Sequence, residues 1–208
     1  IDKAFYDWKD PSKPGVSAGI IKDGEVIYLA GFGSANLGTG TPITPQTKFQ
    51  LGAMSKPFTT LAILLLEEQG KIALNDDIRK HIPELPEYRY TVTIDHLLNH
   101  SSGLYDIGQI NHLINGTTNV TTQDKALELI ASQKTFAYKP GTDFSYIEAV
   151  TESVLMAEIV ARSSGSPFAD FVETDIFEPF GMKNSLIRDD NEIVVDLAEP
   201  YQKEEGDS

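Results

Sequence analysis

The chain has its strand pattern at one end and helix patterns over most of the remainder. Two apolar runs rich in β-branched residues, within 15–36, flank Asp23-Gly24. An Asp-Gly pair between two such runs is a strong signal for a tight β-hairpin turn. A two-stranded hairpin is not a stable sheet by itself. The hairpin must therefore be covered by helices or completed by further strands.

Helix signals begin after Gly52 and predict a helix that ends near Gly70. Pro57 lies in the first turn, where a missing N–H costs nothing, and Gly70 is a typical C-terminal stop. Residues 61–66 are apolar throughout, which predicts a helix buried on all sides rather than an amphipathic one.

Further helices are predicted downstream. Thr93 is an N-cap residue, and the helix that follows it should end before Ser102-Gly103. Residues 111–122 are polar and are predicted to form a loop. Three more helices are predicted, over 122–132, about 148–163 and 167–177.

Composition narrows the possible partners. The 208 residues carry 17 Lys and Arg against 31 Asp and Glu, a net charge of −14. So acidic a surface repels phosphate backbones and anionic lipids, so neither nucleic acid nor membrane is an expected partner. The longest apolar run, 61–66, is too short to span a bilayer. The absence of cysteine excludes disulfides and thiol chemistry.

The segment 51–60, LGAMSKPFTT, looks like a helix start with a Ser-x-x-Lys motif whose serine is replaced by Ala53. Residues at i and i+3 lie on one helix face. A serine there would meet the positive end of the helix dipole, and a buried lysine one turn on could serve as its base. Ser55 is no substitute, because neighbours on a helix do not face each other.

Five segments in this order resemble the serine β-lactamase / DD-peptidase superfamily, in its class C-like, esterase-containing branch. They are 15–33, 47–85, 92–104, 138–146 and 158–185. The segment 92–104 is similar to the family's His-Thr-Ser-Gly-Leu stretch, with Ser101 in place of threonine.

The resemblance implies an α/β (α+β) fold, an antiparallel sheet flanked by helices plus a helical subdomain. The chain would be a single partial domain over 1–208. Its parts would be a hairpin region (1–50), a mainly helical region (51–186) and an acidic irregular tail (187–208).

The resemblance also implies site residues. Ala53 occupies the nucleophile position, Lys56 the general-base position, and Tyr146 the tyrosine of the family's Tyr-x-Asn motif, whose asparagine position holds Glu148. The implied reaction is amide or ester cleavage through an acyl-serine, on a small peptide, a β-lactam or an ester. No cofactor is implied, and an extracytoplasmic location is favoured.

Besides Glu148 in place of the motif asparagine, two further departures from the family shape the expectations. Ala53 has no hydroxyl, so the chain as written is expected to form no acyl-enzyme. The family's Lys/His-Thr/Ser-Gly motif, which lies on a central strand, is absent. We therefore expect a partial chain, with the later strands missing or supplied by a companion chain.

Several interpretations stay open. Three interpretations account for alanine at position 53. The serine was deliberately changed to alanine, or the protein is a natural pseudoenzyme that binds without cutting, or Lys56 is itself the nucleophile. Glu148 is also explained as a first-turn carboxylate stabilised by the helix dipole. His96 and His100 lie at i, i+4, but no third ligand has useful spacing, so no metal is expected.

Overall fold

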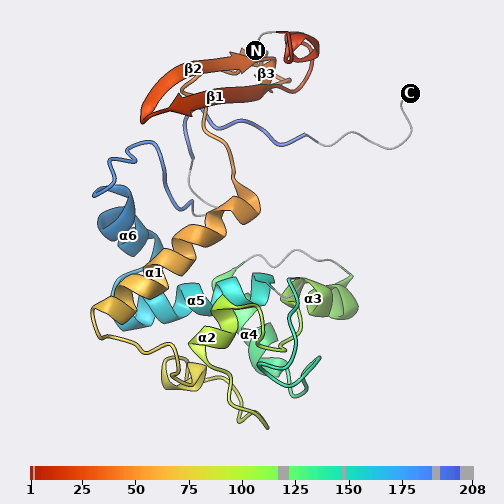
Figure 1. Ribbon diagram of the computed structural model, residues 1–208. Helices are drawn as coiled ribbons and strands as arrows, with labels where there is room; N and C mark the ends of the chain where they lie inside the picture. The colour runs from red at the N-terminus through yellow and green to blue at the C-terminus, as the bar shows by residue number, and fades with distance from the viewer. Residues whose placement is uncertain (2, 117–121, 147–148, 189–192, 202–208) are drawn as a thin grey trace. The chain divides into compact units, whose positions relative to one another are not determined.

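The hairpin is present where the sequence predicts it. In the computed structural model, strand β1 (Val16–Lys22) pairs antiparallel with β2 (Glu25–Phe32) (Figure 1). The turn residues Asp23 and Gly24 have φ angles of 51° and 82°. Two consecutive positive φ angles are the requirement of a type I′ turn, which explains the Asp-Gly pair.

A second, smaller strand pair follows at once. Strand β3 (Ser34–Asn36) pairs antiparallel with β4 (Thr41–Pro42). The prediction of one hairpin over 15–36 missed this pair and included β3 in it. The chain passes close to β2 after β4, because a Cβ on Gly31 would lie 2.2 Å from the Ile43 carbonyl oxygen. A short 3₁₀ turn, η1 (Tyr6–Trp8), precedes the strands.

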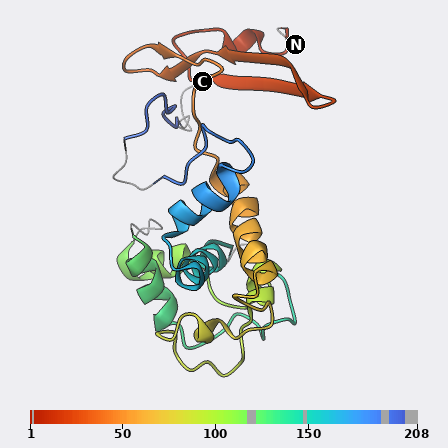
Figure 2. The same cartoon turned by 90° about the vertical axis from the view of Figure 1, so that its left-hand side faces the viewer.

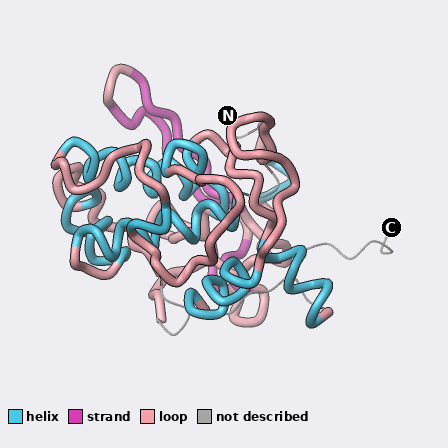
Figure 3. The backbone as a smooth tube through the Cα atoms, turned by 90° about the horizontal axis from the view of Figure 1, so that it is seen from below, coloured by secondary structure: helices cyan, strands magenta, loops and turns pink. Residues whose placement is uncertain are grey.

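The structure describes all residues except 2, 117–121, 147–148, 189–192 and 202–208. The chain forms two compact units. The strand unit comprises Ile1–Gly52 and Arg188–Ser208, and the helical unit comprises Ala53–Ile187. Figure 3 distinguishes the strands of the first from the helices of the second by colour.

Helices α1 (Lys56–Glu68) and α5 (Ala149–Ser164) lie at the centre of the helical unit. Helix α1 follows a 3₁₀ turn, η2 (Gly52–Ser55), and packs against α5 and α6 (Phe168–Val172) (Figures 1 and 2). The fully buried side chains between these elements include Ile63, Leu66 and Ile159.

The expectation that α1 is buried on all sides is wrong. Its buried side chains are Thr59, Ala62, Ile63 and Leu66, which form one stripe. Leu64 is 40% exposed. The core of the helical unit covers one face of α1, so an apolar sequence all round does not give burial all round.

The remaining predicted helices are present, with small shifts at their ends. They are α2 (Ile94–Leu98), α4 (Gln123–Ser132) and α6, which continues into a π turn, η4 (Glu173–Phe177). A short 3₁₀ turn that was not predicted, η3 (Ile78–Lys80), precedes α2. Thr93 caps α2 through its hydroxyl, which accepts from the His96 N–H at 3.2 Å. None of the described helices combines the length and the hydropathy that a membrane span needs.

The predicted loop over 111–122 is wrong in its first half. Helix α3 (Ile107–Asn115) occupies it, and 117–121 lie outside the described residues. The Asp106 carboxylate caps α3 by accepting from the Gln109 N–H at 3.0 Å, and Gly116 ends it with a φ of 72°. These end signals are typical of a helix, but the polar run that follows Ile114 in the sequence favoured a loop.

Candidate active site

The first two predicted site residues lie at the start of α1. Ala53 belongs to the exposed 3₁₀ turn η2, and Lys56 is the first, half-buried residue of α1. Pro57 follows in the first turn, as predicted. Ser55 is the N-cap residue, and its side chain makes no capping hydrogen bond.

The structure brings Tyr146 to Lys56 across 90 positions of sequence. The Lys56 Nζ lies 4.0 Å from the centroid of the Tyr146 ring, over its face. A cation in this place is attracted by the negative face of the ring. The phenol ring is 53% exposed, so the contact lies at the surface of the helical unit. Glu148, the fourth predicted site residue, lies outside the described residues.

His100 is a site neighbour that the sequence analysis weighed only as a metal ligand. Its ring packs edge-on against Tyr146, with centroids 5.0 Å apart and planes at 80°. Its backbone φ is 52°, a left-handed value that is uncommon for a residue other than glycine. The His100 carbonyl accepts from the Ser145 N–H at 3.0 Å and from the Tyr138 hydroxyl at 3.3 Å. His96, by contrast, serves the cap of α2.

Glu152 on α5 is the residue that sequence reasoning missed altogether. Its side chain is fully buried, and one carboxylate oxygen lies 2.5 Å from the His100 Nδ1. The other oxygen accepts from the Ser102 hydroxyl at 2.8 Å. Burial raises the pKa of Glu152, against the opposing effect of the hydrogen bonds from His100 and Ser102. Its signal in the sequence is a carboxylate at i, i+3, i+4 and i+7 spacing with Leu155, Met156 and Ile159, which are buried apolar residues of α5.

The segments 100–104 and 138–146 are docked on each other by backbone contacts. The Gly141 N–H donates to the Ser101 carbonyl at 2.9 Å, and the Ala137 N–H to the Gly103 carbonyl at 2.8 Å. Gly103 has a φ of 70°, and a Cβ there would lie 2.2 Å from the Tyr138 carbonyl oxygen. Only glycine fits this approach, which explains the glycine after Ser102.

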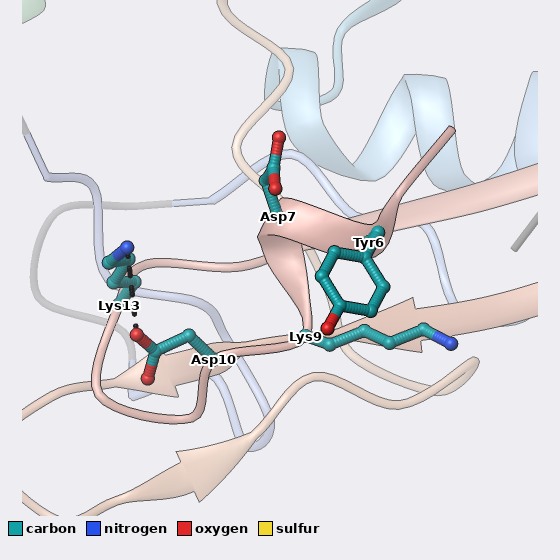
Figure 4. Close-up of a pocket in the computed structure, with 5 residues that line it drawn as sticks. All are labelled: Tyr6, Asp7, Lys9, Asp10 and Lys13. Atoms are coloured by element: carbon teal, nitrogen blue, oxygen red, sulfur yellow. Dashed lines mark ion pairs between the residues drawn. The ribbon is translucent and has the colours of Figure 1, made fainter. Parts of the chain in front are cut away.

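A surface hollow is lined by residues of the strand unit alone. Tyr6, Asp7, Lys9, Asp10 and Lys13 line it (Figure 4). Its one ion pair, between Lys13 and Asp10 at 3.6 Å, is solvent-exposed. Flexible charged side chains in contact with water do not make a specific pocket, and none of the predicted site residues lies here.

Comparisons with known proteins decide the family. Residues 6–207 match the protein family described as Beta-lactamase. The chain belongs to this family. The superfamily resemblance and the predicted α/β fold class are thereby confirmed, and the family is one of serine β-lactamase and penicillin-binding-protein-type hydrolases.

Three relatives illustrate the range of the family. The chain is 33% identical to "Penicillin-binding protein 4*" of Bacillus subtilis over 79% of its own length and 36% of that protein's. It is 29% identical to a D-aminopeptidase of Gluconobacter oxydans, over 91% of the chain and 35% of the relative. A solved structure, an octameric penicillin-binding protein homologue from Pyrococcus abyssi, superposes with a TM-score of 0.72 and 33% identity. That superposition covers 86% of this chain and 41% of that one.

The chain therefore spans little more than a third of the length of the two curated relatives. The helices and the hairpin described above correspond to that part. Statements about the activity of a whole protein of this family go beyond it and are proposals.

Proposed function

We propose that the chain is part of a serine hydrolase of the β-lactamase / DD-peptidase type, which is inactive as written because Ala53 replaces the nucleophile. The whole-protein reaction would be cleavage of an amide or ester through an acyl-serine. The contact of Lys56 with Tyr146 is the observation that supports this best. Both residues were singled out by their places in two separate motifs, and they lie together in the folded chain.

The proposed chemistry assigns each residue a step. A serine hydroxyl at position 53 attacks the substrate carbonyl while Lys56, assisted by Tyr146, takes its proton. The carbonyl carbon–leaving-group bond then breaks, and the leaving group takes that proton. Water hydrolyses the acyl-serine by the same route in reverse. The backbone N–H of residue 53 would donate to the oxyanion, together with one N–H from a later strand.

The present contact limits how this relay can work. Lys56 lies over the ring face of Tyr146, and a proton passes to a phenol only at its oxygen. Tyr146 would therefore take part in the relay through its hydroxyl and not through the ring face that Lys56 contacts.

We propose a small D-amino-acid peptide, a β-lactam or a small ester as the ligand. Names among the relatives, a penicillin-binding protein and a D-aminopeptidase, support this range without choosing within it. We also propose that later strands of the same fold, in this polypeptide or a companion chain, complete the sheet. The hairpin supports this because Ile21, Val26 and Ile27 are each more than half exposed.

A binding protein without turnover is the second candidate. Two positions of the family's motifs differ in this chain, Ala53 and Glu148, rather than one. A pseudoenzyme would keep the ligand site and lack acylation even with serine restored at position 53. A natural binding protein and a silenced hydrolase therefore differ in one measurable property.

The test is intact-mass spectrometry on an Ala53→Ser variant incubated with a fluorophosphonate or with benzylpenicillin. It is made on the 208-residue chain and on the product of the complete reading frame. Ala53→Gly is the matched control, because it changes the same position without adding a hydroxyl. We expect a covalent adduct on Ala53→Ser alone, and denaturing spectra also reveal any companion chain.

Two results would count against the hydrolase. Absence of an adduct in the complete Ala53→Ser protein favours the pseudoenzyme. Substrate hydrolysis by the chain with Ala53 in place would show that an acyl-serine at position 53 is not the mechanism.

A further inference from the structure

A buried, three-residue polar cluster lies behind Tyr146. Glu152 presents one carboxylate oxygen to the His100 Nδ1 at 2.5 Å. Its other oxygen accepts from the Ser102 hydroxyl at 2.8 Å and from the Ser102 N–H at 3.4 Å. Glu152 and Ser102 are fully buried, whereas the His100 side chain is 19% exposed.

Burying a carboxylate costs free energy unless its oxygens have hydrogen-bond partners, so a buried glutamate at this place needs an explanation. In the cluster, both carboxylate oxygens have hydrogen-bond partners, and a proton lies between the imidazole nitrogen and the nearer oxygen. Whichever group holds that proton, a hydrogen bond joins them, so the His100 ring is fixed in one orientation. The cluster therefore works as a rigid attachment point rather than as a buried free charge.

The cluster is not a second hydrolytic triad. A triad needs a serine that gives its proton to the imidazole. Here the Ser102 hydroxyl donates to the carboxylate instead, and the Ser102 side chain is fully buried. We therefore consider a different role for the His100 ring, which is to position a neighbouring side chain.

The exposed side of the His100 ring contacts the predicted site. The Tyr146 ring stands edge-on to it at 5.0 Å, and the Lys56 ammonium lies over the Tyr146 ring at 4.0 Å. His100 is held at both ends, by Glu152 at the ring and by the Ser145 N–H at the carbonyl. Tyr146 is 53% exposed, so the ring contact with His100 is a main restraint on where it lies.

We propose that Glu152 and His100 are a positioning pair for Tyr146: the buried carboxylate fixes the imidazole, and the imidazole holds the tyrosine ring beside Lys56. The geometry of the pair stands without the acyl-serine chemistry. Its value for catalysis rests on the proposed function, because only there does the place of the Tyr146 hydroxyl matter.

The test reads the position of Tyr146 directly by NMR, in the 208-residue chain with Ala53 in place. Lysine amines are converted to ¹³C-dimethylamines, which keep their charge. Methyl protons over the face of an aromatic ring are shifted upfield, so Lys56 should give an upfield-shifted signal. Tyr146→Ala assigns that signal by removing the shift.

We expect Glu152→Leu and His100→Ala to lose most of the Lys56 upfield shift. Glu158→Leu is the matched control: it makes the same change on the same helix, at a carboxylate that pairs with Arg162 and not with His100. It should keep the shift. Far-UV circular dichroism and thermal unfolding of each variant report whether the fold persists.

The positioning pair is overturned if a folded Glu152→Leu or His100→Ala variant keeps the full shift. If Glu152→Leu does not fold, His100→Ala decides, because its side chain lies at the surface of the cluster. If neither folds, the pair serves stability and the proposal is also overturned.

The same spectra separate this proposal from the proposed function. If Tyr146→Ala leaves the Lys56 signal unchanged, the Lys56–Tyr146 contact is absent and the support for both is lost. If the ring shift is present but Ala53→Ser takes up no fluorophosphonate, the positioning pair stands and the hydrolase proposal fails alone.

Discussion

The helical unit and the strand unit of this chain bury their apolar residues to very different extents. In the helical unit, a continuous core runs from Ala62 to Phe177 and includes α1, α5 and α6. In the described part of the strand unit, the buried apolar side chains are Ala35 and Ile43. The hairpin instead exposes large apolar side chains such as Ile21 and Ile27.

The difference follows from where each kind of element finds its partners. A helix satisfies its backbone hydrogen bonds within the segment, so the helices of one stretch of chain, Ala53–Ile187, can already pack into a core. A strand forms its hydrogen bonds with neighbouring strands, and these often come from distant sequence. Among the described residues, β1 and β2 pair with each other and each leaves its second edge unpaired. A part of a mixed fold can therefore have complete helical packing and an incomplete sheet.

The largest expected loss of stability comes from truncating a side chain in the core of the helical unit. Ile159 on α5 is fully buried, and Ile159→Ala should lower the free energy of unfolding by about 2–5 kcal/mol through lost burial and a residual cavity. Ile21→Ala is the matched change in the hairpin, where the side chain is 72% exposed. There the loss should stay within about 0.5 kcal/mol. Chemical denaturation followed by far-UV circular dichroism measures both.

Similar losses for the two isoleucines would contradict the comparison. Such a result would mean that the hairpin is covered in solution, for example by a second copy or by another chain. Repeating the measurement over a range of protein concentrations separates these cases, since only association makes the loss depend on concentration.

Acid should affect the helical unit through Asp76. Its carboxylate accepts from Lys80 and from the Ala73 N–H, and the Lys80 hydrogen bond is the main cause that lowers its pKa to about 2. A carboxyl whose pKa is lower in the folded state stabilises the fold above its unfolded pKa, near 4, and loses that contribution as pH falls toward 2. Lys80 is largely exposed, so solvent screening keeps the effect below about 1 kcal/mol.

Asp76→Asn tests this acid dependence. The wild-type chain should lose stability between pH 4 and pH 2 more steeply than the variant, in denaturation curves taken at each pH. Asp10→Asn is the counterpart in the strand unit, where hydrogen bonds from Ser12 lower the pKa of an exposed carboxyl. Parallel wild-type and Asp76→Asn stabilities across this range would exclude the proposed contribution.

The sequence predicts the fold best where the determining contacts are local. The Asp23-Gly24 turn, the Thr93 cap and the Pro57 start all depend on neighbours within a few residues, and all are present. Helix α3 was mistaken for a loop because the polar run after Ile114 outweighed two correct end signals, at Asp106 and Gly116.

The candidate site divides in the same way. Ala53 and Lys56 were found from a spacing of three residues, and Tyr146 from its own motif, but sequence alone does not bring the two motifs into contact. The sequence analysis missed Glu152 because the role of this residue depends on His100, which lies 52 positions earlier. A carboxylate within an apolar helix face is a usable signal in retrospect, since such a residue is rarely fully buried without a partner.

The smallest effect is expected at the hairpin, and it is the one that depends most on context. Ile27 is 58% exposed, so Ile27→Thr should change the stability of the 208-residue chain by no more than about 0.5 kcal/mol, as threonine suits a strand as well as isoleucine does. If later strands complete the sheet in the full reading frame, the same position is covered, and losing a buried side chain there should cost about 1–3 kcal/mol.

Glu25→Thr, at the first residue of β2, is the control. Its effect on stability should be small both in the 208-residue chain and in the complete protein. A penalty at Ile27 that appears only in the complete protein would locate the missing strands on this hairpin. Equal, small effects in both would mean that the hairpin stays uncovered and that the sheet of this chain differs from the one its family leads us to expect.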